Sequence, residues 1–197
     1  MQDLEEGHEI VVQEMRRLVR KQKGFSLIEL LIVVAIILII AAIAIPNLLR
    51  ARIAANESSA ASSIRTINTA EVSYSTAYPT VGYSATLSVL GNPGGATPCA
   101  PTSTNACLID QVLAAAAAAP GKSGYLISAV GIADPNVATL NSTYQAGAAP
   151  VTWNTTGVKA FCAVEDGVVR VDYGNTGKDV ATVAHNACLA APYVAMQ

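Results

Sequence analysis

Hydrophobic and polar positions first mark off a continuous apolar run near the amino terminus. From Phe25 to Ile45, only Ser26 and Glu29 are polar. A helix of this run is about 31 Å long at 1.5 Å per residue, which matches the hydrocarbon core of a bilayer. The run therefore predicts a membrane-spanning helix. An acid within such a helix costs about 2.5 to 3.5 kcal/mol at the bilayer centre and less near an interface. Glu29 therefore either needs a partner or is an incidental acid at the helix start, where the dipole favours it.

After Pro46 the pattern becomes that of an amphipathic helix, because apolar residues recur at spacings of three, four or seven. Pro46 lacks a backbone donor and is expected to kink the helix, which then resumes and ends near Ala77, before Pro79 and Gly82. The predicted buried face consists of Leu49, Ile53, Ala60, Ile64, Ile67 and Tyr74. The polar residues expected to point away from it are Arg50, Asn56, Glu57, Ser63 and Asn68.

The remainder alternates between loop-like and strand-like composition. Residues 78–123 are rich in Gly, Pro, Ser, Thr and Ala, with one short helix expected at Leu108 to Ala119. From Gly124 onward, strand patterns occur in YLISAV, TYQAGA, VKAFCAV and VVRVDY, and EDG joins the last two as a hairpin. Residues 174–197 have little periodicity. The predicted fold class is α+β, with a long amino-terminal helix packed on an antiparallel sheet of about four strands.

Composition fits one membrane helix followed by one soluble domain. The chain has 197 residues, of which 52% are hydrophobic and 13% charged, and its formal net charge is −2. No basic cluster follows Arg52, so a nucleic-acid surface is not expected. Basic residues gather just before the apolar run, which places the amino terminus in the cytoplasm and the residues after Pro46 across the membrane. These basic residues are Arg16, Arg17, Arg20, Lys21 and Lys23.

Four cysteines lie in the part predicted to be across the membrane, where disulfides form. Four cysteines allow three pairings. Proximity in sequence and the predicted hairpin favour Cys99 with Cys107 and Cys162 with Cys188. No CxxC spacing occurs and the chain has two histidines, so neither a metal site nor a cofactor is expected.

Other motifs lack the context that their chemistry requires. PGKSG at residues 120–124 has alanine at position 116, where a phosphate loop needs glycine, and it precedes a strand, so a turn is expected instead of nucleotide binding. His185 could be drawn into a triad with Asp172 or Asp179, but no nucleophile signature accompanies it. Glu165 and Asp166 supply too few oxygens for calcium. Asn56, Asn141 and Asn154 begin N-x-Ser/Thr triplets, which matter only with a glycosylating system.

The stretch KGFSLIELLIVVAIILIIAAIAIPNLLRAR resembles the amino-terminal signature of type IV pilins. It has a basic leader ending in Gly24, Phe25 as the first mature residue, an acid at the fifth mature position and a proline after the apolar run. The later sequence is more loosely similar, through the long loop, the strand pair FCAVEDGVVRVD and the tail between Cys162 and Cys188.

This resemblance implies a processing and assembly route. A prepilin peptidase would cut between Gly24 and Phe25 and N-methylate Phe25, and the mature helix would rest in the inner membrane. Assembly machinery would then draw subunits into an extracellular helical filament, with the apolar helices at its centre. Glu29 would pair there with the Phe25 amine of an adjacent subunit. The chain would be a structural homo-oligomer, not an enzyme.

The resemblance also divides the chain into five segments. These are the leader 1–24, the membrane and fibre-core helix 25–46, the amphipathic helix 47–77, the loop 78–123, and the sheet with its disulfide-bounded tail 124–197. A pseudopilin of a type II secretion system shares the amino-terminal signature and remains an alternative. A third alternative is an enzyme or binding module held by an uncleaved anchor. Adhesion, motility and DNA uptake all use fibres of such subunits.

Overall fold

The computed structural model describes residues 24–92, 95, 98–174 and 185–196. Its longest element is the helix α2 (Leu27–Ala77), which contains Pro46 and continues past it. The chain divides into two compact units, and the boundary, after Asn47, falls within α2. The helix ends at Ala77 as the sequence predicts, because Pro79 disfavours helical backbone at the residue before it. The leader up to residue 23 lies outside the described residues, and the kink at Pro46 stays a prediction.

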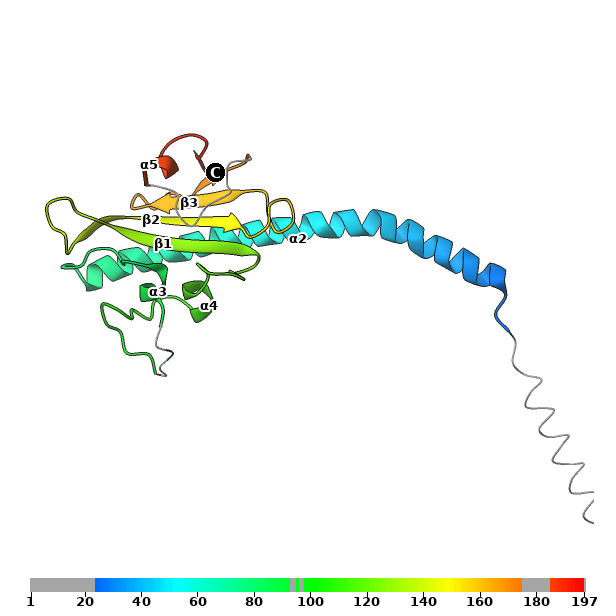
Figure 1. Cartoon of the computed structure of the whole chain (residues 1–197), viewed down its shortest axis with the longest axis horizontal. Helices are drawn as coiled ribbons and strands as arrows, with labels where there is room; N and C mark the ends of the chain where they lie inside the picture. The colour runs from blue at the N-terminus through cyan, green and yellow to red at the C-terminus, as the bar shows by residue number, and fades with distance from the viewer. Residues whose placement is uncertain (1–23, 93–94, 96–97, 175–184, 197) are drawn as a thin grey trace, which may run out of the picture. The chain divides into compact units, whose positions relative to one another are not determined.

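The carboxy-terminal unit contains one antiparallel sheet of five strands in the order β1-β2-β3-β4-β5. The first three strands are labelled in Figure 1, where they lie side by side. Each strand pairs with the next one along the chain. The α+β class, with a long amino-terminal helix and an antiparallel sheet, is therefore confirmed. The strands are β1 (Tyr125–Ala133), β2 (Asn141–Pro150), β3 (Ala160–Val164), β4 (Arg170–Asp172) and β5 (Val194–Ala195).

The fifth strand was not predicted, because two residues are too few to show a periodicity. β5 is held by pairing Val194 with Val171 and by the amide of Met196, which donates to the carbonyl of Val169 at 2.9 Å. The EDG turn is confirmed between β3 and β4, where the amide of Gly167 donates to the carbonyl of Val164. Gly167 has a φ of +71°, a conformation that favours glycine.

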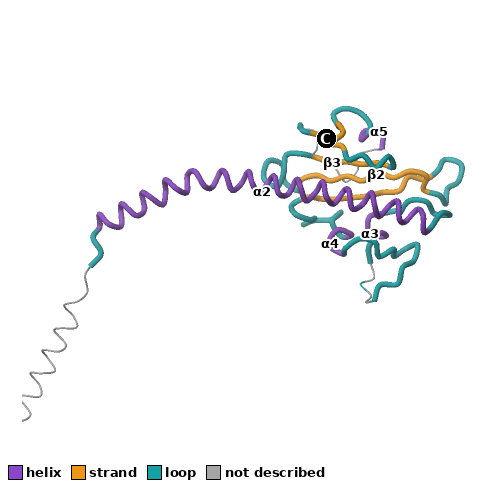
Figure 2. Tube along the Cα trace, turned by 180° about the vertical axis from the view of Figure 1, so that it is seen from behind, coloured by secondary structure: helices purple, strands orange, loops and turns teal. Residues whose placement is uncertain are grey.

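The second half of α2 covers one face of the sheet, as Figure 2 shows from behind. Its buried apolar residues include Ile64 and Ile67, which are both 0% exposed. The predicted face is right at Ala60, Ile64, Ile67 and Tyr74, but wrong at Leu49, which is exposed, while Ile53 is half-buried. The prediction that polar residues point away is also wrong at Glu57, Ser63 and Asn68, which are buried.

The loop after α2 contributes two short helices to the core, α3 (Leu87–Leu90) and α4 (Gln111–Ala114). Leu90 and Leu113 are completely buried. The helix predicted over residues 108–119 is therefore much shorter in the structure. Asp110 caps its start, and the carbonyl of Ala116 accepts the amide of Ile127 on β1 instead of continuing a helical ladder.

Candidate functional site

Glu29 lies in the first turn of α2, so its carboxylate is close to the amino-terminal end of the helix. Gly24 and Phe25 precede the helix and are exposed. The amide of Ser26 donates to Oε2 of Glu29 at 2.9 Å, which satisfies one of the donors that a helix start leaves unpaired. The positive end of the helix dipole also favours an acid there. A chain cut after Gly24 would carry its new α-amine on Phe25, one residue before the Ser26 amide that contacts this carboxylate.

The amino-terminal unit exposes apolar side chains all around the helix. Between residues 24 and 47, no described residue is buried. Within the described residues, α2 is the one helix long and apolar enough to cross a membrane, and the apolar window that qualifies it is 0% buried. A helix that is apolar on every side needs a cover of lipid or of other protein. Its largest exposed side chains include Phe25, Leu27, Leu38, Ile39 and Ile43.

Comparison with known proteins finds a known motif in this segment. A protein-family profile described as the prokaryotic N-terminal methylation motif matches residues 19–45. The amino-terminal segment of the chain therefore carries this methylation motif. Over 38 residues it is 68% identical to the type IV wide pilus major component PilA4 of Thermus thermophilus. Over 54 residues it is 46% identical to the type IV major pilin protein PilA of Myxococcus xanthus.

The similarity is confined to a small part of each protein. The matches cover 19% and 27% of this chain, and 29% and 24% of the two relatives. The chain thus spans less than a third of either relative in these matches. No solved structure matches the chain. The pilin signature therefore rests on the amino-terminal segment, whereas the fold of the carboxy-terminal unit rests on its own structure.

Two further acids on α2 are functional candidates that the sequence analysis either misplaced or did not single out. Glu57 is 6% exposed and Glu71 is 0% exposed, although both belong to a helix with a solvent-facing side. The signal for Glu71 is its spacing, because it lies four residues after Ile67 and three before Tyr74, on the predicted buried face. An acid in this register is either buried with a partner or faces a neighbouring molecule.

Glu57 fastens α2 to the connection between β2 and β3. Its Oε2 lies 2.8 Å from Nζ of Lys159, and its Oε1 accepts the amide of Val158 at 3.1 Å. A neighbouring contact joins the same elements, because Asn56 donates its side-chain amide to the carbonyl of Thr156. A buried carboxylate with a cation and an amide donor has its charge compensated. Glu57 thus positions the connection instead of presenting an acid to solvent.

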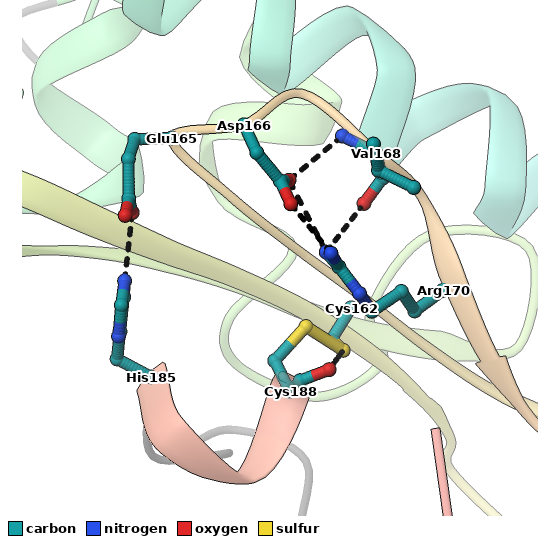
Figure 3. The surroundings of a disulfide bond; sticks show 7 residues. All are labelled: Cys162, Glu165, Asp166, Val168, Arg170, His185 and Cys188. Carbon is teal, nitrogen blue, oxygen red and sulfur yellow. Dashed lines mark hydrogen bonds and ion pairs between the residues drawn. A yellow bond between two sulfur atoms is a disulfide. The ribbon is translucent and has the colours of Figure 1, made fainter. Parts of the chain in front are cut away.

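The second disulfide lies beside a charged turn, shown in Figure 3. Cys162 on β3 is bonded to Cys188 at the end of α5 (His185–Cys188), so this predicted pairing is confirmed. Nearby, Nε2 of His185 lies 2.7 Å from Oε2 of Glu165. Asp166 accepts hydrogen bonds from Arg170, which hold the pKa of its carboxyl below the usual value.

The first disulfide closes a short segment of the loop between Cys99 and Cys107. None of the four cysteines is free. The two bridges lie in different places, one in the loop after α2 and one between β3 and the tail. Each therefore constrains a separate part of the carboxy-terminal unit.

Several of the remaining sequence motifs take part in contacts within the carboxy-terminal unit. PGKSG is a turn, in which the amides and carbonyls of Lys122 and Tyr125 pair, and it leads into β1 as expected. His185 contacts a glutamate, whereas Asp179 lies outside the described residues. Asn141 donates its side-chain amide to the carbonyl of Tyr83 at 2.9 Å, so its triplet lies within a packed contact. Asn154 is exposed.

Proposed function

We propose that this chain is a structural subunit of a type IV pilus, made as a precursor and polymerised into an extracellular helical filament. The observation that carries the proposal is the methylation motif on a helix whose apolar side chains are exposed on every side. The motif supplies the processing signal, and the exposed helix requires a cover. Lipid would cover it before assembly, and neighbouring subunits would cover it in the fibre.

The proposed processing step is hydrolysis of the Gly24–Phe25 peptide bond by a prepilin peptidase, followed by methylation of the Phe25 amine. Both residues precede α2 and are exposed, which leaves the bond accessible to a protease. The mature helix would then anchor the subunit in the inner membrane, with the carboxy-terminal unit on the far side.

Glu29 is proposed to set the position of each subunit in the fibre. An unpaired charge in an apolar core costs several kcal/mol, so the Phe25 amine of one subunit and the Glu29 carboxylate of a neighbour stabilise one docked arrangement. Within one chain the carboxylate already accepts the Ser26 amide. A carboxylate has about four acceptor positions, which leaves capacity for an amine as well.

Mass spectrometry of the protein isolated from sheared surface fibres tests this proposal. The expected species begins at methylated Phe25 and retains both disulfides, and a deletion strain should lack the fibres. A Gly24→Val variant should accumulate as precursor, because a side chain before the bond obstructs the peptidase. A Lys23→Ala variant is the matched control and should be cut normally. A mature mass unchanged in Gly24→Val would contradict the cleavage position.

The same deletion strain distinguishes a pilus subunit from a pseudopilin, which the amino-terminal signature also fits. A pilus subunit predicts that surface fibres disappear while protein secretion continues. Loss of secretion with fibres intact would assign the chain to a type II secretion system instead. An uncleaved chain that retains residues 1–24 would support the anchored enzyme or binding module.

A further inference from the structure

Glu71 is a buried acid without a cation. Its side chain is completely inaccessible, and its two carboxyl oxygens both contact Ser84. The amide of Ser84 donates to Oε2 at 2.9 Å, and the Ser84 hydroxyl lies 2.6 Å from Oε1. Across the described part of the chain, no lysine, arginine or histidine forms an ion pair with Glu71. An ionised Glu71 would therefore lack a cationic partner such as Lys159, which compensates the charge of Glu57.

The hydrogen bonds around Ser84 fit a neutral carboxylic acid. The Ser84 hydroxyl lies within reach of two acceptors, Oε1 of Glu71 and the carbonyl of Thr86 at 3.3 Å. One hydroxyl hydrogen satisfies only one of them. When Glu71 is protonated, its own proton is donated to the Ser84 oxygen, and the serine hydrogen is free for Thr86. All donors and acceptors in this chain of bonds are then used.

Ser84 belongs to a segment, residues 81–86, that runs from the first residue of β2 to the edge of β1. At its start, the amide of Tyr83 donates to the carbonyl of Asn141 at 3.0 Å, and the Asn141 amide donates to the carbonyl of Val81 at 2.8 Å. The amide of Gly131 donates to the carbonyl of Ala85, and Thr86 pairs with Val130 in antiparallel register. A Cβ atom at Gly131 would lie only 2.5 Å from the carbonyl oxygen of Ser84, so the contact is close. Among the described strands, β1 has a partner on one side only, and residues 85–86 cover part of its other edge.

We propose that Glu71 is the latch of a pH-sensitive device, in which the neutral acid holds residues 81–86 against Asn141 and β1 and loss of its proton loosens them. Burial, the largest contribution, raises the pKa of Glu71 from 4.5 to about 7, against the opposing effect of the bonds from Ser84. The titratable groups electrostatically coupled to Glu71 are Tyr74 on α2, Tyr83 in the segment and Tyr144 on β2. Tyrosine is never a cation, so none of them stabilises the carboxylate as a counter-ion.

The sign of the effect follows from the two pKa values. In the open segment Glu71 is solvated and ionises near 4.5, whereas in the closed segment it ionises near 7. The closed form therefore has its full advantage below about pH 4.5 and loses it as the pH rises through about 7. Between about pH 5 and pH 8, the opening equilibrium should increase roughly tenfold to a hundredfold.

Amide hydrogen exchange of the full mature chain in detergent micelles tests the latch. After correction for the intrinsic pH dependence of exchange, protection of residues 81–86 and of Gly131 should fall by that factor between about pH 5 and pH 8. Protection in β3 should change little. Wild-type protection that is equal at both pH values would overturn the proposal.

Two variants on the same helix identify the titrating group. Glu71→Gln keeps an acceptor for the Ser84 amide and a donor for its hydroxyl, so protection should persist without pH dependence. Glu57→Gln removes the other buried acid of α2 and should retain the wild-type pH dependence at residues 81–86. A pH-dependent loss that persists in Glu71→Gln would refute the latch. If that variant does not fold, the carbon-13 carboxyl signal of wild-type Glu71 decides, because a midpoint near 7 supports the latch and one near 4.5 overturns it.

Discussion

Both halves of α2 contain acids next to apolar residues, but the acids of the two halves differ in burial and in hydrogen-bond partners. In the first half, Glu29 lies among exposed apolar side chains, and the hydrogen bond described for its side chain comes from the amide of Ser26. In the second half, Glu57 and Glu71 are buried and are bound by residues from the loop and the β2–β3 connection. The two buried acids of the second half thus have their hydrogen-bond partners within one chain.

This difference separates residues that stabilise the fold of one chain from Glu29, which is proposed to contact a neighbouring subunit. A buried acid with a complete set of partners contributes to the stability of the single chain, and its replacement is measured as a change in unfolding. An acid on an exposed apolar helix acquires its cost only when that helix is covered. Variants in the two halves should therefore change different observables.

The largest expected effect is a loss of fibres when Glu29, the acid of the first half, is replaced. Glu29→Ala should be processed and inserted normally but form no fibres, because the methylated amine of a neighbouring Phe25 would lack its anion in an apolar core. Electron microscopy of cells and immunoblots of membrane fractions measure the two results. Ser26→Ala is the control, since it keeps the backbone amide that Glu29 accepts, and it should form fibres. Abundant fibres made only of the Glu29→Ala subunit would show that the pairing is dispensable.

Truncation of one isoleucine in each half sharpens the comparison. Ile64→Ala should lower the unfolding free energy of the carboxy-terminal unit by about 4 kcal/mol, because Ile64 is 0% exposed and leaves a cavity. Ile36→Ala should leave that free energy unchanged, because Ile36 is 52% exposed. Urea unfolding in detergent, followed by the fluorescence of Trp153, measures both. Equal losses of stability in the two variants would remove the distinction between the halves.

The disulfides should affect only the carboxy-terminal unit, by amounts set by the chain that each one closes. The Cys162–Cys188 bridge spans 26 residues and the Cys99–Cys107 bridge spans 8. On the chain-entropy relation, Cys188→Ser should cost about 3.5 kcal/mol and Cys107→Ser about 2.5 kcal/mol. The same unfolding measurement compares them, and cleavage after Gly24 serves as the control that should not change. The reverse order of stability would mean that native-state contacts outweigh loop closure.

The smallest effect concerns the pair between His185 and Glu165. Glu165→Gln should lower the unfolding free energy by less than about 1 kcal/mol, because both side chains are partly exposed and solvent screens them. Glu57→Gln, which disrupts a more buried pair, is the comparison and should cost more. A loss at Glu165 as large as that at Glu57 would indicate that the turn in Figure 3 carries more of the tail's stability than its exposure suggests.

Local patterns predicted much of this molecule because their causes lie within a few residues. The apolar run, the end of α2 before Pro79 and the EDG turn each depend on neighbouring residues alone, and the structure has all of them. The predicted strands are also present, with shifted ends. The short strand β5 lacked a local cause, since it exists only through its pairing with β4.

For the candidate site, the sequence by itself determined an exposed apolar helix with an acid near its start, since hydrophobicity and the family motif are both written into one short segment. Only the tertiary structure decided which polar residues on the second half of α2 are buried. Asn68 bonds the carbonyl of Gly167, and Glu57 accepts the amide of Val158, about a hundred residues away. Periodicity assigns such residues to a face by their polarity, but a distant partner can make a polar side chain more stable inside than outside.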